Sequence, residues 1–149
     1  MSTKKKILIA IICSILAALL TIIAIVIIRD TARKNKIKQN LIGNTYTYAR
    51  TTTGYDQAYI QMDCYRFETD GTVTEYEVYR TLYDKAKYPN KEDETSESTY
   101  HWNYSIRLKG KDVYIVISGV EFHAEMVGEK VSSITYGGVL QYKKSIGTF

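Results

Sequence analysis

His123 stands between two acidic residues, Glu121 and Glu125, in a segment whose apolar and polar residues alternate. Alternate residues of a β-strand point to the same side, so these three side chains would share one face and could bind a cation together. Neighbouring side chains on one strand face are nevertheless about 7 Å apart, too far for three ligands to close around one metal ion. We therefore expect a solvated strand face here and no metal site.

No other grouping of residues predicts catalysis. His101 lies on the polar side of a second alternating segment, and serine and acidic residues are too frequent to single out a Ser–His–Asp triad. A glycine-rich phosphate-binding loop is absent from the sequence. We predict that the protein is not an enzyme and needs no cofactor.

Strand-forming residues dominate the chain after residue 45, where all fourteen tyrosines lie. In residues 99–108, Tyr100, Trp102 and Tyr104 alternate with polar residues, as expected of a strand with one buried face. We expect Trp102 to be the centre of the core and His101 to face solvent. The alternation and the turn residues predict about eight strands, at residues 45–50, 58–68, 72–82, 99–108, 113–118, 120–126, 132–136 and 139–143.

Two details of this series stand out. The apolar phase of residues 58–68 slips between Cys64 and Tyr65, which predicts a β-bulge in that strand. Asp70-Gly71 and Gly137-Gly138 predict tight hairpins. Residues 84–98 hold the single proline and many charges, so a solvated loop is expected there. The fold class is thus an antiparallel meander, a barrel or a closed sandwich.

Three motifs make this domain similar to small bacterial lipocalin-like domains. They are the opening Gly-Asn-Thr-Tyr-Thr-Tyr of residues 43–48, the Phe67-x-x-Asp70-Gly71-Thr72-Val73 hairpin, and an aromatic strand followed by a Gly turn and a Val/Ile strand in residues 102–117. The resemblance covers most of residues 43–143. It implies an up-and-down barrel or a closed sandwich, often tethered to a bacterial envelope, and brings no catalytic residues. The long charged loop departs from the family pattern.

An uncharged run of 22 residues, 7–28, precedes this domain. As a helix it would be roughly 33 Å long, enough to cross a hydrocarbon core of about 30 Å. A cleaved signal sequence has a shorter apolar core and an Ala-x-Ala site, for which Leu16-Ala17-Ala18 is a poor match. A lipoprotein signal ending at Cys13 would need a small residue where Ile12 stands. We predict a retained transmembrane helix.

Charge is unevenly distributed along the chain. Residues 1–38 contain eight basic residues and one acidic residue, a net charge of +7, whereas the remainder contains twelve and fifteen, a net charge of −3. The basic balance therefore argues for anionic lipid and against nucleic acid as a partner. The basic residues predicted to contact lipid headgroups are Arg29, Arg33, Lys34, Lys36 and Lys38.

Orientation and helix pairing are two further predictions. Counting charges favours a cytoplasmic domain, but a basic start followed directly by an apolar run resembles a signal-anchor, so we predict a cytoplasmic N-terminus and an extracytoplasmic domain. Ala10, Ser14 and Ala18 lie on one helix face, where small residues would let a second copy approach closely and form a homo-oligomer. The two cysteines, Cys13 and Cys64, do not form a disulfide framework.

The predicted organisation is a cytoplasmic tail (1–6), a transmembrane helix (7–28), a basic juxtamembrane linker (29–42) and a barrel-like domain (43–149). The favoured function is a single-pass membrane-tethered binding and assembly module of the cell envelope that contacts a partner protein. The alternative is a lipocalin-like carrier with a small apolar ligand in the barrel. A filled interior would favour the module, and a cavity of several hundred Å³ would favour the carrier.

Overall fold

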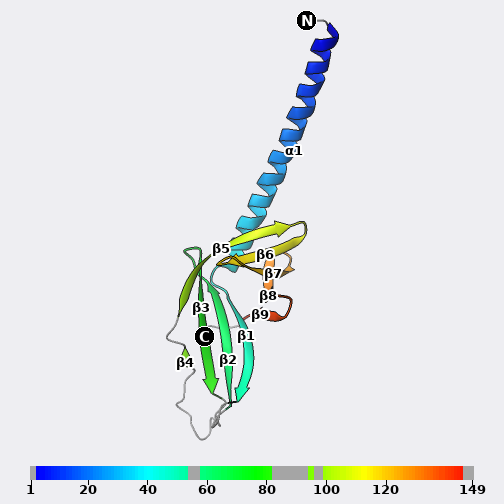
Figure 1. Ribbon diagram of the computed structural model, residues 1–149. Coiled ribbons are helices and arrows are strands. Elements are labelled where there is room, and N and C mark those ends of the chain that lie inside the picture. The colour runs from blue at the N-terminus through cyan, green and yellow to red at the C-terminus, as the bar shows by residue number, and fades with distance from the viewer. Residues whose placement is uncertain (1–2, 54–57, 82–93, 96–98, 146–149) are drawn as a thin grey trace. The chain divides into compact units, whose positions relative to one another are not determined.

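The computed structural model consists of one long helix followed by a closed antiparallel β-barrel (Figure 1). It describes residues 3–53, 58–81, 94–95 and 99–145. The chain divides into two compact units, residues 1–35 and residues 36–149. Both features of the predicted fold class, the apolar N-terminal helix and the barrel of eight strands, are confirmed.

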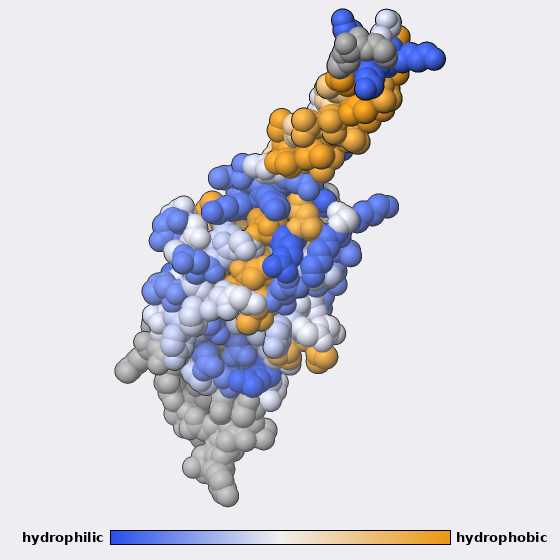
Figure 2. Space-filling view, turned by 45° about the horizontal axis from the view of Figure 1, so that its top comes forward, coloured by the Kyte–Doolittle hydropathy of each residue, from blue (hydrophilic) through white to orange (hydrophobic). Residues whose placement is uncertain are grey.

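Helix α1 is Thr3–Leu41 and contains neither glycine nor proline. Its large apolar side chains between Ile7 and Ile28 are 48–67% exposed, and Figure 2 shows them as a continuous orange surface. The helix is long and apolar enough to cross a membrane. It ends where Gly43 adopts a φ of +78° and the Asn44 amide donates to the Leu41 carbonyl at 3.0 Å.

Eight strands close the barrel in the order β2-β1-β9-β8-β7-β6-β5-β3, and β3 pairs with β2 to complete the ring. The two-residue strand β4, Glu94–Thr95, pairs with residues 78–79 of β3, beyond the part of β3 that pairs with β5. The ring strands are β1 (Thr45–Thr53), β2 (Ala58–Phe67), β3 (Thr72–Thr81), β5 (Tyr100–Lys109), β6 (Asp112–Ile117), β7 (Val120–Val127), β8 (Lys130–Tyr136) and β9 (Leu140–Lys144). Each predicted strand is present. The residues expected to form a solvated loop, 84–98, lie almost wholly outside the described residues.

The β2–β3 hairpin forms at the predicted Asp70-Gly71 turn. Gly71 has a φ of +86°, and Asp70 Oδ1 accepts hydrogen bonds from the Thr72 amide at 2.9 Å and the Thr72 hydroxyl at 2.7 Å. A positive φ favours glycine, and the aspartate side chain supplies the acceptor that the turn backbone lacks. These two residues therefore set the register of the hairpin.

The bulge predicted in β2 is wrong, because β2 pairs without interruption with both of its neighbours. The bulge lies instead between β7 and β8, at Glu125 and Met126. The apolar phase of β2 slips because both of its faces are covered. Tyr65 and Phe67 belong to the barrel interior, whereas Met62 and Cys64 pack with Tyr76 and Val78 in a second, smaller cluster.

The main core receives residues from all eight ring strands and from the last two turns of α1. Ile37 and Leu41 of α1 are 0% exposed, as are Tyr46 and Phe67 beside them in the same cluster. The Phe67 ring packs edge-on against Tyr46 at 5.6 Å and against Tyr104 at 4.9 Å. The end of α1 thus fills part of the barrel interior.

Two buried tyrosines of this core should respond differently to loss of their hydroxyl groups. The Tyr46 hydroxyl donates to the Val131 carbonyl at 3.0 Å, whereas the buried Tyr104 hydroxyl has no hydrogen-bond partner among the described residues. We expect Tyr46→Phe to lower the free energy of unfolding by about 1–2 kcal/mol, because the buried Val131 carbonyl loses the hydrogen bond from the Tyr46 hydroxyl. Tyr104→Phe should leave it unchanged or raise it. Denaturant unfolding of both variants checks the pair, and equal losses would contradict the assignment.

Candidate functional site

A cavity of about 410 Å³ lies in the barrel interior next to the packed core. Its lining comes from seven strands and one turn, and consists of Tyr65, Glu75, Trp102, Ile117, Ser118, Val120, Phe122, Tyr136, Leu140 and Tyr142. Two of these residues, Val120 and Tyr136, are 39% and 46% exposed, so they mark the side on which the cavity meets solvent. The interior is therefore filled in one part and hollow in another.

The period of two residues along a strand explains where the cavity begins. Phe67, Val73 and Ile115 are fully buried in the core. The residues two positions away from these on the same strands, and on the same face, line the cavity; they are Tyr65, Glu75 and Ile117. The packed layer and the hollow layer are thus successive rows of the same inward-facing side chains.

Glu75 is the single carboxylate among the described lining residues, and two neighbours hold it in place. Its Oε1 accepts a hydrogen bond from the Tyr65 hydroxyl at 3.1 Å, and its Oε2 accepts one from the Trp102 indole nitrogen at 2.6 Å. Tyr65 is directly opposite Glu75 in the β2–β3 ladder, which explains the first bond. Burial, and then the charge of Glu75, raise the pKa of Tyr65, so that hydroxyl remains protonated.

Nothing basic neutralises Glu75 in the part of the chain that the structure describes. The ion pairs found there use other carboxylates, among them Arg66 with Glu68 and Lys36 with Glu129. Each oxygen of a carboxylate can accept two hydrogen bonds, so each oxygen of Glu75 can accept one more. Glu75 therefore presents a fixed negative charge with unused acceptor capacity to the cavity.

Aromatic rings form most of the remaining wall. The Tyr65 ring contacts Phe122 at 5.4 Å and Tyr142 at 5.1 Å between centroids, and Phe122 contacts Tyr136 at 5.6 Å. The Trp102 ring is stacked on Tyr100 at 5.9 Å. These mutual contacts fix the rings in place before any ligand arrives.

Asp63 adds a second carboxylate on the inward face of β2, two residues from Tyr65. Burial raises its pKa, the nearby guanidinium of Arg50 lowers it, and the neighbouring Glu77 and Glu75 raise it, with a net increase. Arg50 Nη2 lies 3.9 Å from Asp63 Oδ1, an ion pair without a hydrogen bond. The charge of Asp63 is therefore offset by Arg50.

The sequence alternation correctly predicted that Trp102 faces the barrel interior, but it did not predict how far the side chain is buried. Trp102 is half-buried at the cavity wall, whereas the fully buried centre contains Phe67, Tyr46 and Ile115, so the prediction that Trp102 is the centre of the core is wrong. Sequence reasoning also missed Glu75. The available signal was its position two residues after Val73, and therefore on the same face of β3.

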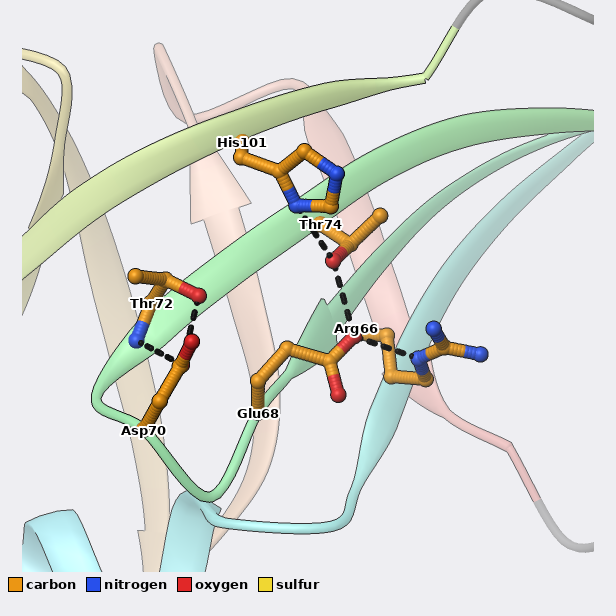
Figure 3. Close-up of polar contacts among 6 residues, drawn as sticks. All are labelled: Arg66, Glu68, Asp70, Thr72, Thr74 and His101. Carbon is orange, nitrogen blue, oxygen red and sulfur yellow. Dashed lines mark hydrogen bonds and ion pairs between the residues drawn. The ribbon is translucent and has the colours of Figure 1, made fainter.

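His101 is exposed, as predicted, and joins a polar cluster on the outer surface (Figure 3). The Thr74 hydroxyl donates to Glu68 at 2.7 Å and lies 3.1 Å from His101 Nδ1. A hydroxyl has one proton to donate, so Nδ1 must carry the proton of this second bond. Arg66 also donates to Glu68, at 2.7 Å. The cluster ties β2, β3 and β5 together and does not face the cavity.

The candidate cation ligands have separate partners. Glu121 pairs with Arg107 and Lys109, Glu125 accepts from Ser133 at 2.7 Å, and His123 Nε2 lies 3.8 Å from Asp112. Within residues 3–53, 58–81, 94–95 and 99–145, no three His, Cys, Asp or Glu side chains are grouped to hold a metal ion.

The helix residues singled out by sequence are all placed. Ala10, Ser14 and Ala18 are exposed, and the Ser14 hydroxyl donates to the Ala10 carbonyl at 2.9 Å. Arg29 and Lys34 are exposed, and Arg33 is half-buried. Lys36 pairs with Glu129 at 2.8 Å, and Lys38 Nζ lies 5.5 Å from the Tyr104 ring centre. Helix pairing and headgroup contact stay predictions.

Comparison with known proteins gives no relative from which a function could be transferred: no protein-family model, no curated protein and no solved structure matches the chain.

Proposed function

We propose that the chain is a membrane-tethered binding protein that holds a small organic ligand inside its barrel. The observation that carries this proposal is the 410 Å³ cavity with its aromatic wall and exposed rim. Small-molecule sites are typically clefts of about 300–1,000 Å³, mostly apolar, with a few fixed polar groups. This matches the expected carrier function better than the assembly module, for which a filled interior was expected. We retain the lipocalin-like identity as part of the proposal.

Binding without catalysis is the activity that the lining supports. Of the described residues around the cavity, none is histidine, lysine or cysteine, and its polar groups are one carboxylate, three tyrosines, a serine and an indole. The carboxylate is already hydrogen-bonded to two wall residues and faces no bound base or nucleophile. These groups can orient a bound ligand through hydrogen bonds and charge.

The single tryptophan of the chain lines the cavity, so its fluorescence reports occupancy directly. We expect aromatic probes to cause a saturable change in Trp102 emission when the full chain is held in galactolipid nanodiscs. The double substitution Val120→Phe with Leu140→Phe should abolish that change, because both side chains would fill the cavity. Val127→Phe, at an exposed position outside it, is the control. Unaltered binding in the filled variant would refute the proposal.

The tether is the second part of the proposal. The apolar surface of α1 supports a helix that stays in the membrane. The basic N-terminal start followed directly by the apolar run supports an extracytoplasmic barrel. N-terminal sequencing of membrane-extracted protein should find the native start, and a start after Ala18 would indicate signal cleavage. Protease added to intact protoplasts should remove the barrel, whereas a protected barrel would reverse the orientation. Lipid contact, a partner protein and pairing of two copies remain predictions.

A further inference from the structure

We propose that the ligand of this cavity is a small organic cation, a substituted ammonium that carries an apolar group. This inference rests on the proposed ligand-binding function and names the class of ligand. It follows from three properties of the described wall residues: a fixed carboxylate without a basic partner among them, aromatic side chains beside it, and an apolar remainder.

The charge of Glu75 sets the sign of the ligand. A carboxylate in a partly desolvated site attracts a cation more strongly than it would in water, and it repels an anion equally. Tyr65 and Trp102 hold both oxygens of Glu75, so little reorganisation is needed when a cation arrives.

The aromatic rings explain why an organic cation suits the site better than a metal ion. A substituted ammonium binds over aromatic faces within about 6 Å of the ring centre, and tryptophan is the best partner. Trp102 and Tyr65 both line the cavity and both donate hydrogen bonds to Glu75, so a cation beside the carboxylate would lie next to both aromatic side chains. A metal ion would need several oxygen, nitrogen or sulfur ligands, and the lining provides one carboxylate.

The rest of the cavity suits an apolar substituent. Ile117, Phe122 and Leu140 line it without offering a charged group, and Val120 and Tyr136 are exposed at its rim. Burial of apolar surface contributes about 25 cal/mol per Å², so a ring or short chain attached to the ammonium would add affinity. A ligand with both parts fits the wall better than a simple ammonium ion.

Three probes of matched size separate this inference from the function on which it rests. Benzyltrimethylammonium is cationic, neopentylbenzene is its neutral isostere, and phenylmethanesulfonate is an anion with the same ring. Each is titrated against the full chain in nanodiscs of a neutral galactolipid, and Trp102 emission is read. We expect the cation to bind about tenfold more tightly than the neutral isostere, and the anion to bind least.

Substitution of Glu75 identifies the group responsible. Glu75→Gln keeps acceptor and donor atoms for Tyr65 and Trp102 but removes the charge, so we expect it to cancel the tenfold preference for the cation over the neutral isostere. Glu121→Gln removes a carboxylate that pairs with Arg107 and Lys109 away from the cavity, and it should have no effect. Glu75→Asp retains the charge and should retain a preference for the cation, which keeps the test decisive if Glu75→Gln fails to fold.

The outcomes are distinguishable. If no probe binds, the proposed function and this inference both fail. If the neutral probe or the anion binds as tightly as the cation, or if Glu121→Gln and Glu75→Gln have equal effects, only the inference fails. A substituted ammonium ligand could be a lipid headgroup or a free small molecule. Repeating the titration in phosphatidylcholine nanodiscs distinguishes these two. Competition by the choline headgroups would identify a lipid as the ligand, whereas unchanged affinity would indicate a free cation.

Discussion

A chain that begins at Gly43 should fail to fold, whereas a chain that begins at Lys36 should fold. The shorter chain lacks Ile37 and Leu41, which are both 0% exposed in the barrel core. Removal of a large aliphatic side chain from a core costs about 2–5 kcal/mol, and a domain of this size has only about 5–15 kcal/mol in total. The loss of both side chains would therefore consume most of the stability.

The same truncation also removes polar contacts of the helix end. Lys36 pairs with Glu129, and the Asn40 side chain donates to the Glu129 carbonyl at 3.0 Å. Circular dichroism and amide proton dispersion in NMR spectra of the two fragments measure the difference. Lys36→Ala in the longer fragment is the matched control and should cost less than about 1 kcal/mol, because the ion pair is exposed. Equal folding of both fragments would show that the helix end is dispensable.

Phe67→Ala should destabilise the barrel by about 3–5 kcal/mol. Phe67 is 0% exposed and packs edge-on against both Tyr46 and Tyr104, so its removal leaves a cavity that these two rings cannot fill from their fixed positions. Its amide also pairs with the Asn44 carbonyl at 3.0 Å, a backbone contact that the substitution retains. The expected loss therefore reports side-chain packing.

Val127→Ala provides the comparison, because Val127 is 70% exposed and its truncation should change stability by less than about 0.5 kcal/mol. Denaturant unfolding of the full chain, followed by Trp102 emission, measures both variants. A loss below about 1 kcal/mol for Phe67→Ala would mean that the core is not organised around these rings.

Sequence alternation predicted most of the ring strands because they have one face in the core and one in solvent, as in β5. There Tyr104 and Ile106 are buried and Ser105 and Arg107 are exposed. The same rule failed at β2, where Met62 and Cys64 are covered on the face opposite Tyr65 and Phe67. The sequence of a strand that is buried on both faces shows no clear alternation of apolar and polar residues. The pattern of β2 therefore predicted a bulge where the backbone is regular.

The burial of the end of α1 escaped prediction for a different reason. Ile37 stands among Lys34, Lys36 and Lys38, a composition typical of a solvated linker. Its burial depends on the barrel that receives it, which no local pattern encodes. Long-range packing of this kind becomes visible only when the strands that form the receiving surface are placed.

The sequence predicted some inward-facing residues of the candidate site, but it did not predict the cavity between them. The alternation in residues 99–108 indicated that Trp102 faces inward, but filled and hollow layers of a barrel have the same period. Whether a layer is filled depends on the sum of side-chain volumes from seven strands. Glu75 lies two residues after Val73 and therefore on the same face of β3, but its role depends on its bonds to Tyr65 and Trp102, which come from two other strands.

The most direct test of the central claim is a crystal structure of the full chain grown with benzyltrimethylammonium. We predict density for the probe in the cavity, with its ammonium group beside the Glu75 carboxylate and within about 6 Å of the Trp102 ring centre. An empty cavity at a probe concentration that saturates Trp102 emission, or a probe bound outside the barrel, would contradict the account.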